Sequence, residues 1–338
     1  MGWGALARWG CLLLAVGAMP ARASEAAAQE TAPPADEPTP PAEETTKPPA
    51  QEERSLLDRI RPRARLLLGV DADEREEWAR RYGVQQARLG ITLREELYRV
   101  EVEADLAETS VLNDAWIELR AAKPFRFRIG RFKEPFGLFR TESSWDLPIP
   151  ERPAYAKAAQ DLGFGGRDLG ATLRYDLAFF ELQAGLFQGT GVGAEAPQET
   201  GIVRLTAAPF SFVELGTSLG RRAIFDGGDG NAIGFDAKLA LLGFGVLAEW
   251  QEASNVGRKL IERGGAVLLS RRMAIDEKFW FEPALGADSL EGSGNGLAAG
   301  VGVGLEDRFV ARVALRRAPR GEENEEATKV ALQMGVQL

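Results

Sequence analysis

The residues best suited to chemistry in this 338-residue chain are arginines placed two positions apart. Arg126 and Arg128 alternate with Phe125, Phe127 and Ile129. This spacing places both arginines on one face of a β-strand and the apolar side chains on the other face. A guanidinium group presents paired donors in a planar fork that fits phosphate oxygens, and it keeps its charge at physiological pH. Such a pair can bind an anion on the side of the strand that faces water.

Catalytic chemistry has little support in the sequence. The chain contains no His, and its only Cys is Cys11, near the N-terminus. This composition leaves no His as a general base and no Cys or His nucleophile or metal ligand in the body of the chain. Ser143 and Ser144 lack a His partner, and the glycine-rich stretch 163–168 leads into a predicted strand, whereas a nucleotide site needs a helix. We expect no cofactor, no metal and no enzymatic activity, with a hydrolase as the weaker alternative.

A long connection follows the two arginines. Residues 133–166 are rich in Pro, Gly and charge, and connections of this length in a compact domain are usually functional. Pro135 and Gly137 suit a sharp turn of the chain where the strand ends. The connection carries acids that either bind a divalent cation or, as we expect, pair with neighbouring bases: Asp146, Glu151 and Asp161 with Arg152, Lys157 and Arg167.

The chain has three predicted parts. Residues 1–23 have the basic, apolar and small-residue regions of a signal peptide, and their apolar run is too short for a spanning helix. Residues 24–54 are rich in Ala, Pro, Glu and Thr and predict a disordered linker, for which a contact with the cell wall is one role. Residues 55–338 carry the strand-like segments. The formal net charge of −9 is not that of a nucleic-acid-binding protein.

Apolar residues recur at every second position through residues 55–338, which is the strand period. About sixteen such segments of about ten residues each can be counted, and ten residues is the length of a tilted strand that crosses a bilayer. Short connections alternate with longer ones, which include 71–82, 133–166, 188–199 and 286–296. These features predict an all-β transmembrane antiparallel β-barrel of about sixteen strands, embedded in the lipid of a bacterial outer membrane.

A soluble all-β protein is the alternative, because its strands also alternate between apolar and polar residues. Two features count against it. The apolar face is nearly uniform over every segment, whereas the other face is rich in charge and in the 38 glycines of the chain. The chain also has no pair of cysteines that could form a disulfide, although it carries an export signal.

Part of the chain resembles the phosphate-selective porin O and P family. Three short motifs, GRFKEPFG, RDLG and FQG, carry the likeness through Gly130, Phe132, Lys133, Pro135, Phe136, Gly137, Arg167, Asp168, Gly170, Phe187 and Gly189. The likeness is dense over residues 110–190 and loose from there to Leu338.

The resemblance implies a homotrimeric porin whose water-filled channel takes up small inorganic anions such as phosphate or polyphosphate. It also implies that the loop after the fifth strand folds into the lumen and constricts it. We expect the constriction loop and its base to include Pro135, Phe136, Gly137, Arg167 and Asp168. The anion contacts that we expect are Arg126, Arg128, Lys133, Arg312 and Arg316. A general porin without phosphate preference and a non-conducting structural or adhesive barrel are the alternatives.

The phase of the strands also predicts two charged surfaces inside the barrel. Cations gather on the first two and last two strands: Arg63, Arg65, Arg88, Arg94, Arg312, Arg316 and Lys329. The third strand carries Glu101, Glu103 and Asp105 on its lumenal face. We expect the basic wall to face these acids across the pore and to create a transverse field, the alternative being that the charges pair among themselves.

Overall fold

The computed structural model describes residues 59–189, 199–223, 230–255, 260–320 and 325–338. The predicted signal peptide at 1–23 and linker at 24–54 lie outside the described residues. Among the residues that are described, no helix is long and apolar enough to span a membrane.

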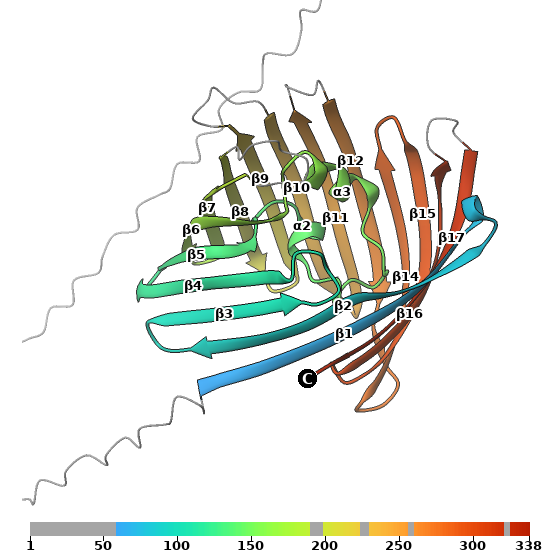
Figure 1. Cartoon of the computed structure of the whole chain (residues 1–338), viewed down its shortest axis with the longest axis horizontal. Helices are drawn as coiled ribbons and strands as arrows, with labels where there is room; N and C mark the ends of the chain where they lie inside the picture. The colour runs from blue at the N-terminus through green and yellow to red at the C-terminus, as the bar shows by residue number, and fades with distance from the viewer. Residues whose placement is uncertain (1–58, 190–198, 224–229, 256–259, 321–324) are drawn as a thin grey trace, which may run out of the picture. The chain divides into compact units, whose positions relative to one another are not determined.

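One antiparallel sheet contains every strand and closes on itself, because β1 pairs with both β2 and β17 (Figure 1). The strands are β1 (Ile60–Asp73), β2 (Ala79–Arg94), β3 (Tyr98–Asp105), β4 (Leu112–Ala122), β5 (Phe125–Lys133), β6 (Arg167–Leu177), β7 (Phe180–Phe187), β8 (Thr200–Phe210), β9 (Val213–Arg222), β10 (Gly230–Leu241), β11 (Phe244–Asn255), β12 (Leu260–Arg271), β13 (Met273–Ala274), β14 (Phe279–Leu290), β15 (Gly294–Leu305), β16 (Phe309–Arg320) and β17 (Glu325–Gln337). β12 and β13 pair with β14 in one continuous register and form a single strand. The predicted barrel of sixteen strands is therefore confirmed.

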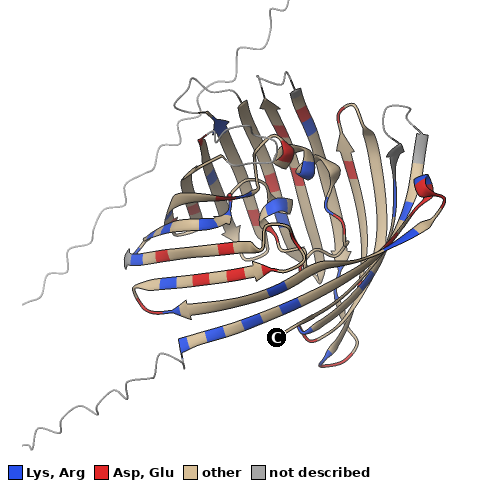
Figure 2. Ribbon diagram, in the orientation of Figure 1, with Lys and Arg blue, Asp and Glu red and all other residues tan. Residues whose placement is uncertain are grey.

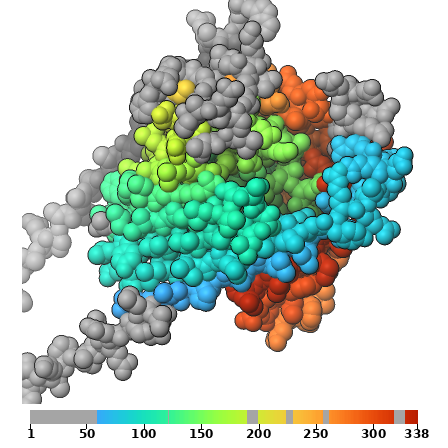
Figure 3. Space-filling model, in the orientation of Figure 1, coloured from blue at the N-terminus to red at the C-terminus, as the bar shows by residue number. Residues whose placement is uncertain are grey.

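Side chains along each strand point alternately to the lipid outside the barrel and to the water inside it. On β5, Phe125, Phe127 and Ile129 are 47%, 41% and 48% exposed on the outer face, where the bilayer covers them. Strand pairing runs all the way around the sheet, so the closed barrel leaves no sheet edge in the hydrocarbon. Space-filling atoms form a continuous wall across β1 to β7 (Figure 3).

Two of the connections expected to be long are short, because the strands run further than the pattern predicts. β1 and β2 stay paired up to Asp73 and Ala79, and only residues 74–78 separate them, with the 3-10 helix η1 (Glu74–Glu76). β14 and β15 are joined by residues 291–293 alone. Gly292 and Gly294 have φ of +81° and +90°, a conformation that glycine adopts at low cost in a tight turn.

The connection 134–166 folds into the barrel, as expected, and carries two helices, α2 (Leu138–Thr141) and α3 (Ala154–Asp161). α3 packs against β11, β12 and β14, so the loop lies on the wall opposite to the strands from which it starts (Figure 1). Two buried apolar clusters join the loop to that wall. We call this segment the constriction loop.

The receiving wall has small side chains on its inner face, which makes room for the constriction loop. The buried residues there include Ala232, Ala253, Ala266, Ala284 and Ala314. A Cβ atom on Gly264 would lie 2.4 Å from the Cβ of Tyr155, and one on Gly220 would lie 2.7 Å from the ring of Phe164. The small residues predicted on the lumenal face thus allow close packing of the loop.

Candidate functional site

A buried carboxylate fixes the constriction loop to the far wall. Glu249 of β11 is 5% exposed and accepts hydrogen bonds from the backbone N–H groups of Leu138 and Phe139, at 3.0 and 2.9 Å. It also accepts one from the Tyr155 hydroxyl of α3, at 3.1 Å. Gln251 donates a further hydrogen bond to the same carboxylate. One side chain therefore holds the first turn of α2 and the side of α3.

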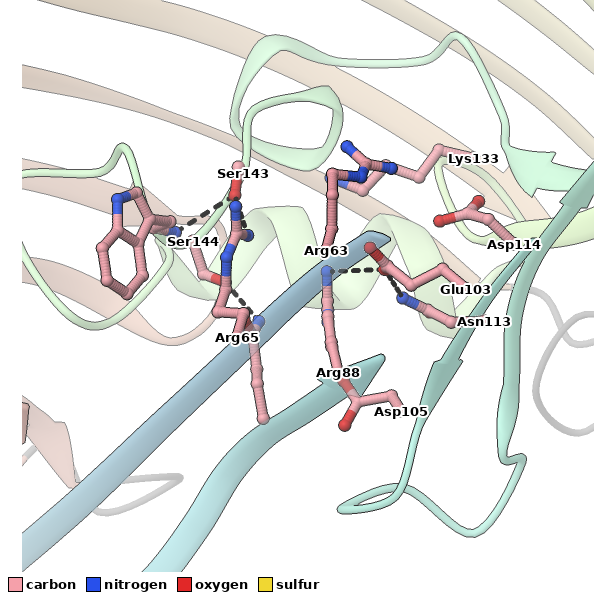
Figure 4. A network of polar contacts seen from close by, with 12 residues as sticks. Arg63, Arg65, Arg88, Glu103, Asp105, Asn113, Asp114, Lys133, Ser143 and Ser144 are labelled. Carbon is pink, nitrogen blue, oxygen red and sulfur yellow. Dashed lines mark hydrogen bonds and ion pairs between the residues drawn. The ribbon is translucent and has the colours of Figure 1, made fainter. Parts of the chain in front are cut away.

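The tip of the constriction loop reaches the strands on the other side of the lumen. Arg65 of β1 donates a hydrogen bond of 3.0 Å to the Ser143 hydroxyl, and its guanidinium lies 5.2 Å from the Trp145 ring (Figure 4). Arg312 of β16 is 2% exposed and donates to the Trp145 carbonyl and to Gln333. The loop therefore spans the lumen, and Arg312 acts as a support of the loop.

Three cations at the constriction are held by carbonyl groups instead of carboxylates. The Lys133 ammonium donates to the carbonyls of Thr141 and Glu142, at 3.1 and 3.0 Å. Arg152 donates to the carbonyls of Phe139 and Glu142, at 2.7 and 2.8 Å. Arg140 donates only to the Gly165 carbonyl, at 3.1 Å. Within the described ranges none of the three forms an ion pair. We call Lys133, Arg140 and Arg152 the eyelet cations.

The eyelet cations are crowded by other positive groups. Burial, together with the guanidinium of Arg140 and then that of Arg167, lowers the pKa of Arg152 to about 10. Burial and the guanidinium of Arg167 also lower the pKa of Arg140. Arginine keeps its charge at neutral pH, so the two guanidinium groups repel each other. An anion between them would relieve this repulsion.

Three of the four arginines predicted as anion contacts are paired with acids of the barrel wall, whereas Arg312 donates to Gln333 and to a loop carbonyl. Arg128 donates to Glu118 at 2.6 Å and lies 4.1 Å from the Trp116 ring. Arg126 donates to Asp176 at 2.8 Å, and Arg316 to Asp288 at 2.5 Å. These three side chains lie on the lumenal face of the barrel, but each one is paired with an acid. Of the predicted set, only Lys133 lies in the cluster of eyelet cations.

The acids of β3 expected to face the basic wall across the pore lie next to that wall. β3 pairs with β2, so its acids lie beside the cations instead of across from them (Figure 2). Arg63 meets Glu101 at 2.5 Å, and Arg88 lies 2.8 Å from Asp105 and 3.4 Å from Glu103 (Figure 4). The alternative, in which lumenal charges pair among themselves, describes these strands better.

The residues predicted at the loop base lie together. Phe136 is fully buried against the Phe164 ring at 5.7 Å, and Gly137 has φ of +76° where the chain turns towards Glu249. Arg167 pairs with Asp114, and Asp168 accepts a hydrogen bond from the Gly189 N–H. Pro135 stands between Glu134 and Phe136 at the same bend.

None of the pairs expected between Asp146, Glu151 or Asp161 and Arg152, Lys157 or Arg167 forms a salt bridge in the described part of the chain. Arg167 pairs with Asp114 of β4 instead of a loop acid, and Glu151 pairs with Lys329 of β17. The loop is held to the barrel by contacts to the wall, because its two ends lie close together and its middle crosses the lumen. No cluster of acidic residues suited to a metal ion occurs in the described part of the chain.

The family model for phosphate-selective porins O and P matches residues 62–234, slightly more than half of the sequence. The chain belongs to this family. It is a porin of the bacterial outer membrane, as both the family and the barrel indicate. No curated protein sequence matches the porin.

Solved porin structures share the fold at low sequence identity. The anion-selective porin from Comamonas acidovorans has a TM-score of 0.63 at 13% identity and covers 82% of this chain and 99% of its own. OmpF of Salmonella typhi, in complex with daunomycin, has a TM-score of 0.61 at 11% identity and covers 82% and 97%. The channel DcaP of Acinetobacter baumannii has a TM-score of 0.55 at 11% identity, with the same two coverages.

Sequence reasoning missed Arg140 and Glu249, which matter most to the geometry of this porin. Arg140 lies in the short segment FRTESS and carries no motif signal. Glu249 was visible only as a charge in a strand, GVLAEWQE, where the phase places it inside the barrel. A lone inward carboxylate among alanines and glycines is costly to bury without donors. That cost indicates that hydrogen-bond donors from another part of the chain must pack against this position.

Proposed function

We propose that this porin conducts small anions and selects them at the eyelet cations. The observation that carries the proposal is that Lys133, Arg140 and Arg152 donate only to backbone carbonyls. A carbonyl dipole satisfies a donor without cancelling the charge, so these three groups keep their positive charge in the narrowed passage. Cations are repelled there, and an anion exchanges its water for guanidinium and ammonium donors.

Phosphate and polyphosphate are the substrates that this chemistry suits best. The arginine forks present paired donors, and the mutual repulsion of the eyelet cations favours an ion with more than one negative charge. The family description supports the same choice. Arg126, Arg128, Arg312 and Arg316 then serve as supporting wall charges that guide the ion, alongside their structural contacts.

The assembly that we propose is a homotrimer without enzymatic activity. OmpT of Vibrio cholerae, described in a trimer form, has a TM-score of 0.58 at 10% identity and supports this proposal. Residues 1–23 would direct export, and residues 24–54 would remain outside the barrel as a linker.

The zero-current potential of single porin channels across a potassium chloride gradient tests the proposal directly. We expect a potential of the sign that marks anion preference, and a block of chloride current when phosphate is added. A potential that marks cation preference would refute anion selection.

A general porin is the second candidate, and the paired wall favours it. Arg126, Arg128 and Arg316 each contact an acid within 2.8 Å, so much of the lumen is close to neutral. A zero-current potential near zero, with no effect of phosphate, would support this function over the first.

A further inference from the structure

A cavity of about 560 Å³ lies at the mouth of the barrel, on the side of the long connections. It lies between α3, the turn 291–293 and the η1 segment, and its lining includes Arg75, Arg140 and Lys157. Long connections face the outside of the cell in bacterial barrels, so this cavity is on the route into the eyelet. We call it the outer cavity.

The cationic part of the outer cavity has spare donors. Lys157 is exposed on α3 and makes no hydrogen bond or ion pair with another described residue. Arg140 and Arg152 donate only to carbonyls of the constriction loop. Arg75 is held by Asp73 through its Nε and Nη2 atoms. Three cations without an acidic partner among the described residues thus share one cavity with two that are paired, Arg75 and Arg316.

The opposite part of the outer cavity presents acceptors. Asp288 accepts a hydrogen bond from Arg316 at 2.5 Å and a long one of 3.4 Å from the Ala154 N–H. Glu151 accepts one from Lys329. A carboxylate has about four lone-pair sites, so both groups can accept further hydrogen bonds. The Ser293 hydroxyl in the adjoining turn also lines the cavity.

We infer that the outer cavity binds a phosphorylated polyol of the sugar-phosphate class before it enters the eyelet. The phosphate would contact Lys157, Arg140 and Arg152, and the hydroxyl groups would donate to Asp288 and Glu151. Orthophosphate at neutral pH offers only one or two P–OH donors to these acceptors and its charge is repelled by them, whereas a polyol offers several neutral hydroxyl donors. The cavity is also in the size range of sites for organic ligands, about 300–1,000 Å³, which a single phosphate ion would leave mostly empty.

This inference rests on the proposed function, and current block in planar bilayers tests it with defined probes. Glucose 6-phosphate, orthophosphate and glucose are added singly to the side of the long loops. We expect glucose 6-phosphate to block at about a tenfold lower concentration than orthophosphate, because of added hydrogen bonds to charged acceptors, and glucose to block least. Equal block by the two phosphates would overturn the inference.

Two variants locate the block. Lys157→Gln should raise the half-blocking concentration of glucose 6-phosphate several-fold, and Ser293→Ala should raise it less while leaving orthophosphate unaffected. Lys278→Gln, in the short turn before β14 at the other end of the barrel, is the matched control and should change nothing. An unchanged block in Lys157→Gln would place the site elsewhere. An anion-selective channel without preference for glucose 6-phosphate would refute the inference alone, whereas a cation-selective channel would refute the proposed function as well.

Discussion

Tyr155 on α3 donates a hydrogen bond of 3.1 Å to the carboxylate of Glu249 on β11, inside the barrel. The same carboxylate receives the backbone N–H groups of Leu138 and Phe139. Residues about a hundred positions apart in the chain thus decide where the constriction loop lies. We expect the width of the channel to depend on this contact.

Removal of the Glu249 carboxylate should loosen the constriction loop. Glu249→Ala leaves two backbone donors and a hydroxyl buried without a partner, at a cost of about 1–3 kcal/mol for each group that water cannot reach. Single-channel recordings should show frequent substates and higher current noise than the wild type. Tyr155→Phe loses one hydrogen bond, about 1 kcal/mol, and should show a weaker form of the same change. Steady currents in both variants would contradict the role of Glu249.

The eyelet cations should dominate anion preference, and the paired wall arginines should not. Arg140→Gln removes a charge without an acidic partner and should move the zero-current potential clearly towards neutrality. Arg126→Ala combined with Arg128→Ala should move it less, although two charges are lost. Both arginines leave behind an acid, Asp176 or Glu118, that another arginine still contacts.

The comparison of these two variants in the same salt gradient is the measurement. Arg263→Gln serves as the control, because Arg263 is an exposed arginine paired with Glu252. A larger shift in the double variant than in Arg140→Gln would show that the wall arginines, and not the eyelet cations, select the ion.

The base of the constriction loop should be sensitive to pH near neutrality. Burial, and then the carboxylate of Asp168, raises the pKa of Glu134 to about 7. A raised pKa means that the folded loop favours the neutral acid, so this contribution to stability is complete below about pH 4.5 and is lost as the pH rises through 7. From pH 5 to pH 8 the midpoint of thermal unfolding should therefore fall, and the current noise should rise. Glu134→Gln should make both quantities independent of pH over this range. If the variant kept the pH dependence of the wild type, Glu134 would not be the group responsible.

Shortening the constriction loop should widen the channel. Deletion of residues 140–160 removes α3 and most of the apolar contact with the far wall. Single-channel conductance should rise, because the barrel itself is closed by strand pairing that does not involve the loop. Unchanged conductance with a correctly folded barrel would mean that ions pass outside the region covered by these residues.

The sequence by itself determined the barrel and the presence of its internal loop. Alternation is a local property, since each strand must present one face to lipid and the other to water, and β5 shows it in nine residues. The motif around Pro135 and Gly137 marked the bend at which the loop begins. Strand ends were harder to predict, because pairing continues through Asp71 and Asp73, and Asp is a residue that strands disfavour.

Only the tertiary structure decided which charges remain available to an ion. Arg128 and Lys133 are both basic residues of β5, yet the register places Glu118 opposite Arg128, whereas Lys133 reaches carbonyls of the folded loop. Cross-strand neighbours depend on register, and loop contacts depend on where distant side chains such as Glu249 hold the backbone. The attraction between a lumenal cation and an anion falls with distance, and an acidic partner of the cation weakens it further. It therefore depends on these long-range positions and cannot be predicted from residue types alone.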